Sequence, residues 1–191
     1  MTNYDIELAL CHAAAVRSVV KVRVMDGSQN GSCNIIGSVV QCSAQLFVIA
    51  EIVDAHKYDG WSIHRVSDVS EIESPYIHHE FISDALRLRS VVQPSVDELS
   101  LGGFVVAVAS VATLQSVVSV VYVSGDESVC DVGVIVASGD DHFLMRTISP
   151  DGDWIDDIVS VAIDSVVWIE FGGEYDRSLL MVANSRYRRE T

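Results

Sequence analysis

The sequence predicts a mainly β protein of the α+β class, built from two similar halves with helices before and after each set of strands. Apolar residues make up 49% of the 191 residues, so the chain can bury a substantial core and is not disordered. Valine is frequent, and its branched Cβ favours strands. A shift of 96 residues brings matching residue types of the two halves together, which indicates an internal duplication.

Glycine, phenylalanine and aspartate mark this repeat. A strand glycine removes the side chain where two backbones approach, and an aspartate before a strand can hydrogen-bond its own turn. The sequence therefore predicts two domains, residues 1–92 and 93–191. The matching positions are Gly37 with Gly133, Phe47 with Phe143, and Asp68 with Asp164.

Each half contains five predicted strands. Gly, Asn, Asp and Ser separate them, and these residues supply the conformations that tight turns need. The alternation in VKVRV, residues 20–24, is typical of a half-buried strand. The predicted strands are 18–26, 33–42, 45–54, 61–66 and 69–73 in the first half, and 117–124, 129–137, 142–149, 156–162 and 165–171 in the second.

Helices are predicted around both sets of strands. Thr2 or Asn3 can cap the first helix, and Ser95 with Glu98 forms a capping-box pattern before the third. The apolar run at 104–123 is long enough for a bilayer, but polar residues interrupt it, so a buried helix leading into a strand is expected rather than a membrane span. The predicted helices cover 4–17, 76–90, 96–115 (disturbed at Gly102 and Gly103) and 174–188.

The order of these elements resembles the Sm and Lsm family. The residues that carry the resemblance are 20–28, Gly37, 47–49 and 62–72 in the first half, and 117–123, Gly133, 143–145 and 158–169 in the second. The resemblance implies two tandem five-stranded antiparallel barrels, each with a preceding helix. It also implies a homo-oligomer that can form a ring, because such barrels close rings through their edge strands.

The resemblance carries no RNA-binding residue with it. RNA-binding members have an Asp and an Asn after the strand glycine, where this chain has Ser43 and Phe47, and then Gly139 and Phe143. The net charge of −15 also opposes nucleic-acid binding, because affinity for phosphate backbones comes from Lys and Arg. RNA binding is thus expected only by analogy of fold.

The densest polar cluster invites a metal interpretation. Hard cations prefer several carboxylate oxygens on one loop, but this loop lacks the glycine and glutamate spacing of an EF-hand. A solvated acidic loop is the alternative. The weak metal candidates are Asp151, Asp153, Asp156 and Asp157.

No pattern predicts catalysis or a cofactor. The chain has no GxSxG, GxGxxG or P-loop, and the adjacent His78 and His79 point about 100° apart on a helix. His64 alternates with Ile63 on a strand and is expected to face solvent or a partner. The four cysteines lack metal or disulfide spacing, so we expect reduced thiols. With a polar N-terminus, this predicts a cytoplasmic protein.

The sequence therefore predicts a non-catalytic binding or scaffold protein rather than an enzyme. A homo-oligomer and a protein partner are expected, with no cofactor. Two alternatives stay open at this point, an RNA-binding protein of the Sm-like kind and a metal-binding protein that uses the acidic loops of the second half.

Overall fold

The chain divides into two compact units, Met1–Asp97 and Glu98–Thr191. The predicted domain bounds, residues 1–92 and 93–191, stay a prediction. The computed structural model describes residues 2–27, 31–53, 56–96, 98–114 and 117–190.

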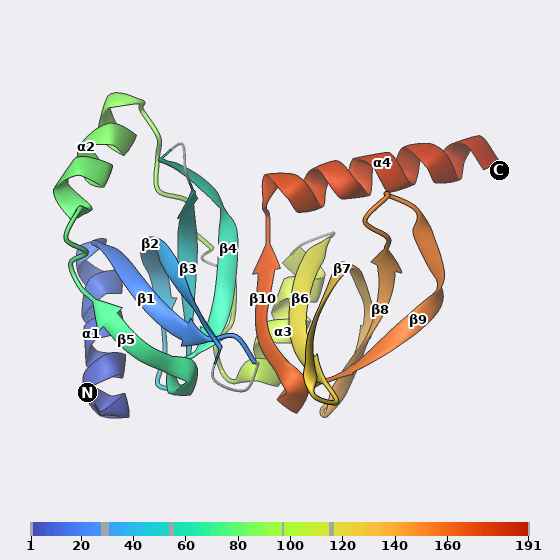
Figure 1. Ribbon diagram of the computed structural model, residues 1–191, viewed down its shortest axis with the longest axis horizontal. Helices are drawn as coiled ribbons and strands as arrows, with labels where there is room; N and C mark the ends of the chain where they lie inside the picture. The colour runs from blue at the N-terminus through green and yellow to red at the C-terminus, as the bar shows by residue number, and fades with distance from the viewer. Residues whose placement is uncertain (1, 28–30, 54–55, 97, 115–116, 191) are drawn as a thin grey trace. The chain divides into compact units, whose positions relative to one another are not determined.

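The first unit is an antiparallel sheet in the strand order β5-β1-β2-β3-β4, with a helix at each end of its sequence (Figure 1). A one-turn 3-10 helix, η1, leads into the last strand. The elements are α1 (Asn3–Val16), β1 (Val19–Met25), β2 (Ser32–Cys42), β3 (Leu46–Val53), β4 (Lys57–Arg65), η1 (Val66–Asp68), β5 (Val69–Glu73) and α2 (His79–Leu88).

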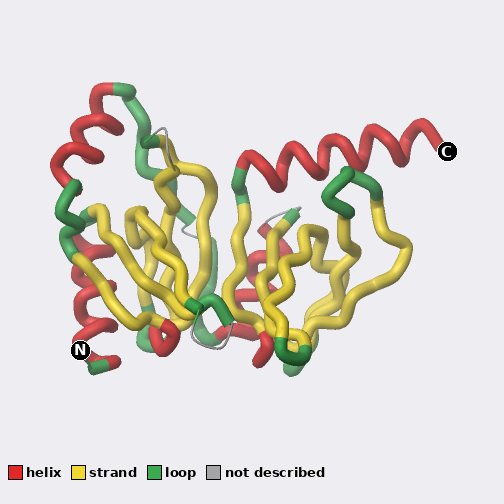
Figure 2. Tube along the Cα trace, viewed as in Figure 1, coloured by secondary structure: helices red, strands yellow, loops and turns green. Residues whose placement is uncertain are grey.

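The second unit repeats this plan, with the strand order β10-β6-β7-β8-β9 (Figure 2). A 3-10 helix, η2, again precedes the last strand. The elements are α3 (Phe104–Leu114), β6 (Val118–Ser124), β7 (Glu127–Ser138), β8 (His142–Ile148), β9 (Trp154–Ala162), η2 (Ile163–Ser165), β10 (Val166–Phe171) and α4 (Glu174–Glu190).

The prediction of two closed five-stranded barrels is wrong. The ten strands form open, antiparallel sheet structure, and among the described strands no ladder joins β4 to β5 or β9 to β10. Alternation and turn residues predict that strands exist, but barrel closure depends on a ladder between the first and last strands of the order, which no residue type reports. The Sm-like resemblance, which implied those barrels, is overturned with them.

The core of the first unit follows from period-two burial. Val20, Val22 and Val24 point to one face of β1 and are each fully buried. Helix α1 covers that face with Leu10 and Ala13, which are also fully buried. The helix begins at a capping box in which the hydroxyl of Thr2 accepts a hydrogen bond from the Asp5 amide, and the Asp5 carboxylate accepts one from the Thr2 amide.

The repeated residues occupy matching places in the two units. Phe47 and Phe143 are both fully buried. Gly37 and Gly133 lie just before a register shift in β2 and β7. Asp68 lies in η1 and Asp164 in η2, the turns that lead into the last strands, and Asp68 accepts a hydrogen bond of 2.9 Å from the hydroxyl of Ser67.

The third helix is shorter than predicted. It begins at Phe104, so Ser95 and Glu98 do not form its capping box, and Gly103 just before it has a φ of 139°, outside the helical region. The carbonyl oxygen of Glu98 instead accepts a hydrogen bond from the Ser110 side chain. Within the described ranges, no helix has both the length and the apolar character needed to cross a bilayer.

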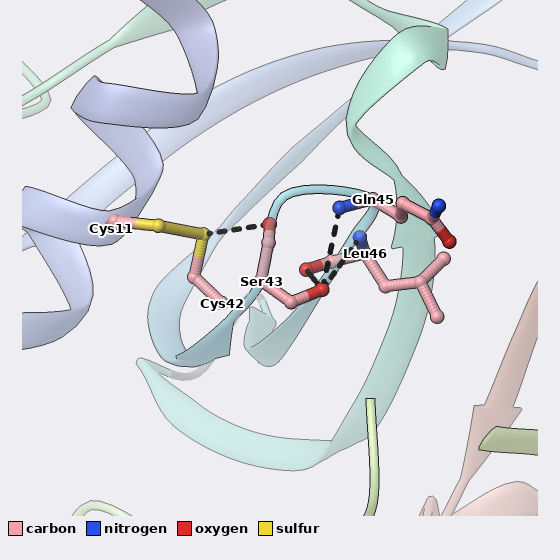
Figure 3. The surroundings of a disulfide bond; sticks show 5 residues. All are labelled: Cys11, Cys42, Ser43, Gln45 and Leu46. Atoms are coloured by element: carbon pink, nitrogen blue, oxygen red, sulfur yellow. Dashed lines mark hydrogen bonds between the residues drawn. A yellow bond between two sulfur atoms is a disulfide. The ribbon is translucent and has the colours of Figure 1, made fainter. Parts of the chain in front are cut away.

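The prediction that all four cysteines are reduced is wrong for two of them. Cys11 of α1 and Cys42 at the end of β2 form a disulfide, with their Cα atoms 5.3 Å apart (Figure 3). Directly after Cys42, the Ser43 hydroxyl accepts a hydrogen bond from the Leu46 amide and closes the turn into β3. Cys33 and Cys130 lie outside the disulfide. The sequence missed the bridge because the two residues are 31 positions apart on different kinds of element.

Candidate functional site

The second unit contains an open groove of about 600 Å³ between two helices and the sheet. Clefts of several hundred Å³ are typical of ligand sites. Two hollows of the first unit have only about 30 and 80 Å³. The groove is therefore the candidate functional site. Its lining residues are Ala112, Thr113 and Leu114 of α3, Val134 of β7, Trp154 of β9, and Leu180 and Asn184 of α4.

The groove forms because α4 covers only part of the sheet beneath it. In one row of cross-strand neighbours, Ile148 lies opposite Trp154 and is buried against Leu179 and Ala183 of α4. In the next row, Val134 lies opposite Arg146. This second row is left partly open and supplies the floor of the groove.

Arg146 is the distinctive polar group beside the groove. Its guanidinium carbon lies 4.7 Å from the centre of the Trp154 ring and 5.6 Å from the centre of the Tyr187 ring. In the sequence of residues 98–191, it is the one Lys or Arg that lies outside α4. Arginine stacks on aromatic faces and keeps its charge at every physiological pH. Through Trp154, the groove therefore lies next to a fixed positive charge and a second aromatic ring.

The four aspartates predicted as weak metal candidates lie near this groove but do not converge. Asp153 accepts a hydrogen bond of 2.8 Å from Arg186 of α4 and forms an ion pair with it. Asp151 lies in the same turn, and Asp156 and Asp157 are exposed on β9. In the part of the chain that the structure describes, no group of three or more His, Cys, Asp or Glu residues is arranged to hold a metal.

His64 is buried rather than exposed as the sequence suggested. Only 2% of the residue is accessible, its ring stacks on Phe47 at 5.4 Å, and its Nε2 lies 2.8 Å from the hydroxyl of Ser62. Strand β4 buries Ser62, Ile63 and His64 in succession, so both of its faces are covered there. Burial lowers the pKa of His64 from 6.5 to about 3. This Ser–His pair is out of reach of a substrate.

His64 should make the stability of the first unit depend on pH. The unfolded chain binds a proton near pH 6.5 and the folded one only near pH 3. The free energy of unfolding should therefore fall as the pH drops below 6.5, by about 1.4 kcal/mol per pH unit from this group. Urea unfolding between pH 7 and pH 4.5 (about the range a histidine titrates) should show a shallower fall in His64→Gln.

The matched control for this measurement is His12→Gln, because His12 is exposed on α1. Its dependence on pH should equal that of the natural protein. An equally steep fall in His64→Gln and in the natural protein would contradict the assignment, whatever constant loss of stability the substitution brings.

The free thiol of Cys130 is a poor nucleophile. Desolvation and the negative charges of Glu170, Asp131 and Asp176 raise its pKa to about 11. The thiol is therefore protonated at neutral pH, whereas reactive cysteines need the thiolate. Nearby, Asp176 of α4 is buried and accepts a hydrogen bond of 2.8 Å from the hydroxyl of Ser119, so this carboxylate fixes the start of α4 to the sheet.

A charged surface of the first unit occupies the corresponding face of its sheet. Arg23 forms an ion pair of 3.1 Å with Glu71 and donates a hydrogen bond to Asn34. Lys21 lies 6.0 Å from the centre of the Tyr76 ring. The hollow among these side chains holds about 30 Å³, roughly the space of one water molecule. Charges of opposite sign lie close together on this surface, and its hollow offers little room for a ligand.

Comparison with known proteins assigns no family. No protein-family description matches the chain, and no curated protein matches it. Among solved structures, K. pneumonia MrkH in its apo state aligns over 100% of this chain and 97% of that chain, with 9% sequence identity and a TM-score of 0.20. A similarity at this level supports no conclusion about fold or function, so the function has to be argued from the groove.

Proposed function

We propose that this protein is a non-catalytic binding protein whose groove in the second unit holds an apolar segment of a protein partner. The observation that carries the proposal is the open groove of about 600 Å³ with Val134, Leu180 and Trp154 in its lining. Partly open apolar surface with an aromatic anchor is typical of surfaces that bind another chain. Asn184 supplies a hydrogen-bonding group at the wall.

Two groups that could serve catalysis are poorly suited to it. His64 and Ser62 are buried together, and the thiol of Cys130 is held protonated. A nucleophile needs both access and an activated form. These observations support a binding role over an enzymatic one.

The two alternatives gain no support. RNA binding rested on the Sm-like resemblance, which the open sheets overturn, and the net charge of −15 opposes it. A metal site in the acidic turn is disfavoured because the Asp153 carboxylate already forms an ion pair with the Arg186 guanidinium. A homo-oligomer stays a prediction, and solution mass is the measurement that checks it.

A cytoplasmic location also stays a prediction, and the disulfide between Cys11 and Cys42 weighs against it. Disulfides persist mainly in oxidising compartments and are rare in the cytosol. Alkylation of free thiols in freshly lysed cells, followed by mass spectrometry of Cys11 and Cys42, would decide between the two.

The groove can be tested by filling it. Thr113 and Asn184 are exposed at opposite walls, so Thr113→Trp and Asn184→Trp should fill the groove at little cost to folding. A random peptide library displayed on phage and selected against the full chain should yield apolar peptides. We expect both substitutions to weaken the binding of these peptides at least about tenfold, because the side chains compete for the same space.

The matched control is Val16→Trp, which places the same bulk on exposed surface of α1 in the first unit. It should leave peptide binding unchanged. A selection that yields no peptide, or peptides that bind Thr113→Trp and Asn184→Trp as well as the natural chain, would contradict the proposed function.

A further inference from the structure

We propose that the segment held in the groove presents a carboxylate group to Arg146. This inference rests on the proposed function and adds the chemistry of the partner. The evidence is the position of Arg146 beside the groove, the way its guanidinium is held, and the absence of an internal ion pair to that group among the described residues.

The guanidinium is held in place by aromatic rings rather than by acidic groups. Trp154 and Tyr187 lie at 4.7 Å and 5.6 Å from its carbon, measured to the ring centres. A guanidinium that lies over an aromatic ring can keep its N–H edge for a further partner. That edge presents parallel donors that match the two oxygens of a carboxylate.

Some of the other arginines are engaged by acidic neighbours. In the described part of the chain, Arg23 pairs with Glu71, Arg87 with Asp84, and Arg186 with Asp153. For Arg146, the side chains described up to residue 188 provide the two ring contacts and no ion pair. The residue is nevertheless half-buried, in a chain whose net charge is −15. A partly desolvated cation without a counter-charge is costly, and a bound carboxylate would offset that cost.

Among the described side chains, the acidic groups near the groove do not serve as the counter-charge of Arg146. Asp153 is engaged by Arg186, and Asp156 and Asp157 are exposed on β9 without an ion pair to Arg146. Val134, which faces Arg146 across the β7–β8 ladder, is apolar. An incoming segment would therefore place its apolar side chain on the floor beside Val134 and its carboxylate on the guanidinium edge.

The test uses three synthetic probes and the full chain. The probes are acetyl-Leu-Val-Leu with a free carboxylate, the same peptide as its carboxamide, and acetyl-Leu-Asp-Leu carboxamide. Binding is followed by NMR through the indole N–H signal of Trp154, assigned with Trp154→Phe. We expect at least one carboxylate-bearing probe to bind about tenfold more tightly than the acetyl-Leu-Val-Leu carboxamide, as charge-assisted hydrogen bonds allow.

Arg146→Gln should remove this preference, and Arg146→Lys should restore part of it, because lysine keeps the charge and loses the planar fork. Arg177→Gln is the matched control: it makes the same change of net charge at an exposed position of α4 and should keep the full preference. The free-acid and aspartate probes distinguish a chain terminus from an acidic side chain as the source of the carboxylate.

Two results would overturn the inference. If the carboxamide of acetyl-Leu-Val-Leu bound as tightly as both carboxylate probes, or if the preference survived in Arg146→Gln, the groove would hold apolar segments without a carboxylate contact, and the proposed function would stand. If none of the three probes moved the Trp154 signal, both the inference and the proposed function would fail.

Discussion

Replacing Gly37 with alanine should strongly destabilise the first unit, and Gly133→Ala should do the same to the second. A Cβ atom at Gly37 would overlap the carbonyl oxygen of Ala50 and lie 2.8 Å from Cγ1 of Ile49. At Gly133 it would overlap the carbonyl oxygen of Arg146 and lie 2.8 Å from the Cα of Thr147. The neighbouring strand cannot move away without breaking its ladder. Each substitution should cost about 3 kcal/mol or more, the upper range of overpacking effects.

Urea denaturation followed by circular dichroism measures this cost. Gly102→Ala is the matched control, because a Cβ there has its first neighbour, the Ser100 side chain, at 3.9 Å. It should change the free energy of unfolding by less than about 1 kcal/mol. If Gly37→Ala and Gly133→Ala unfolded at the same urea concentration as Gly102→Ala, the close approach of β2 to β3 and of β7 to β8 would be contradicted.

These two glycines also show how far the sequence could predict the fold. Their spacing revealed the repeat, and the alternation of valines with turn residues predicted all ten strands within a few residues. The sequence could not predict that the sheets stay open, because the edges of a sheet are set by backbone pairing. It placed the start of the third helix too early, since the capping pattern at Ser95 and Glu98 is local, whereas Gly102 and Gly103 break the helix.

The candidate site was harder to predict for a similar reason. The groove is lined by α3, two strands and α4, which are distant in the sequence and adjacent only in the fold. The acidic turn attracted attention because its charges are contiguous, but the partner of Asp153 is Arg186, 33 residues away. One signal was visible: Arg146 interrupts the strand FLMRTI, and a lone basic residue in an apolar strand needs a specific environment.

Reducing the disulfide between Cys11 and Cys42 should lower the free energy of unfolding of the first unit by about 3 kcal/mol. The bridge spans 31 positions, and a cross-link of that span removes much of the freedom of the unfolded chain. It ties α1 to the end of β2, next to the turn that Ser43 closes (Figure 3). The folded state should survive reduction, because Leu10 and Ala13 remain buried against the sheet.

The measurement compares urea unfolding of the natural chain with and without dithiothreitol. The double substitution Cys11→Ser with Cys42→Ser should match the reduced chain and no longer respond to dithiothreitol. Cys33→Ser is the control, because Cys33 lies on the same strand as Cys42 but outside the disulfide, so its substitution should leave the response to dithiothreitol intact. If the natural chain unfolded identically in both conditions, the bridge would contribute nothing to stability, and α1 would be held by its apolar contacts alone.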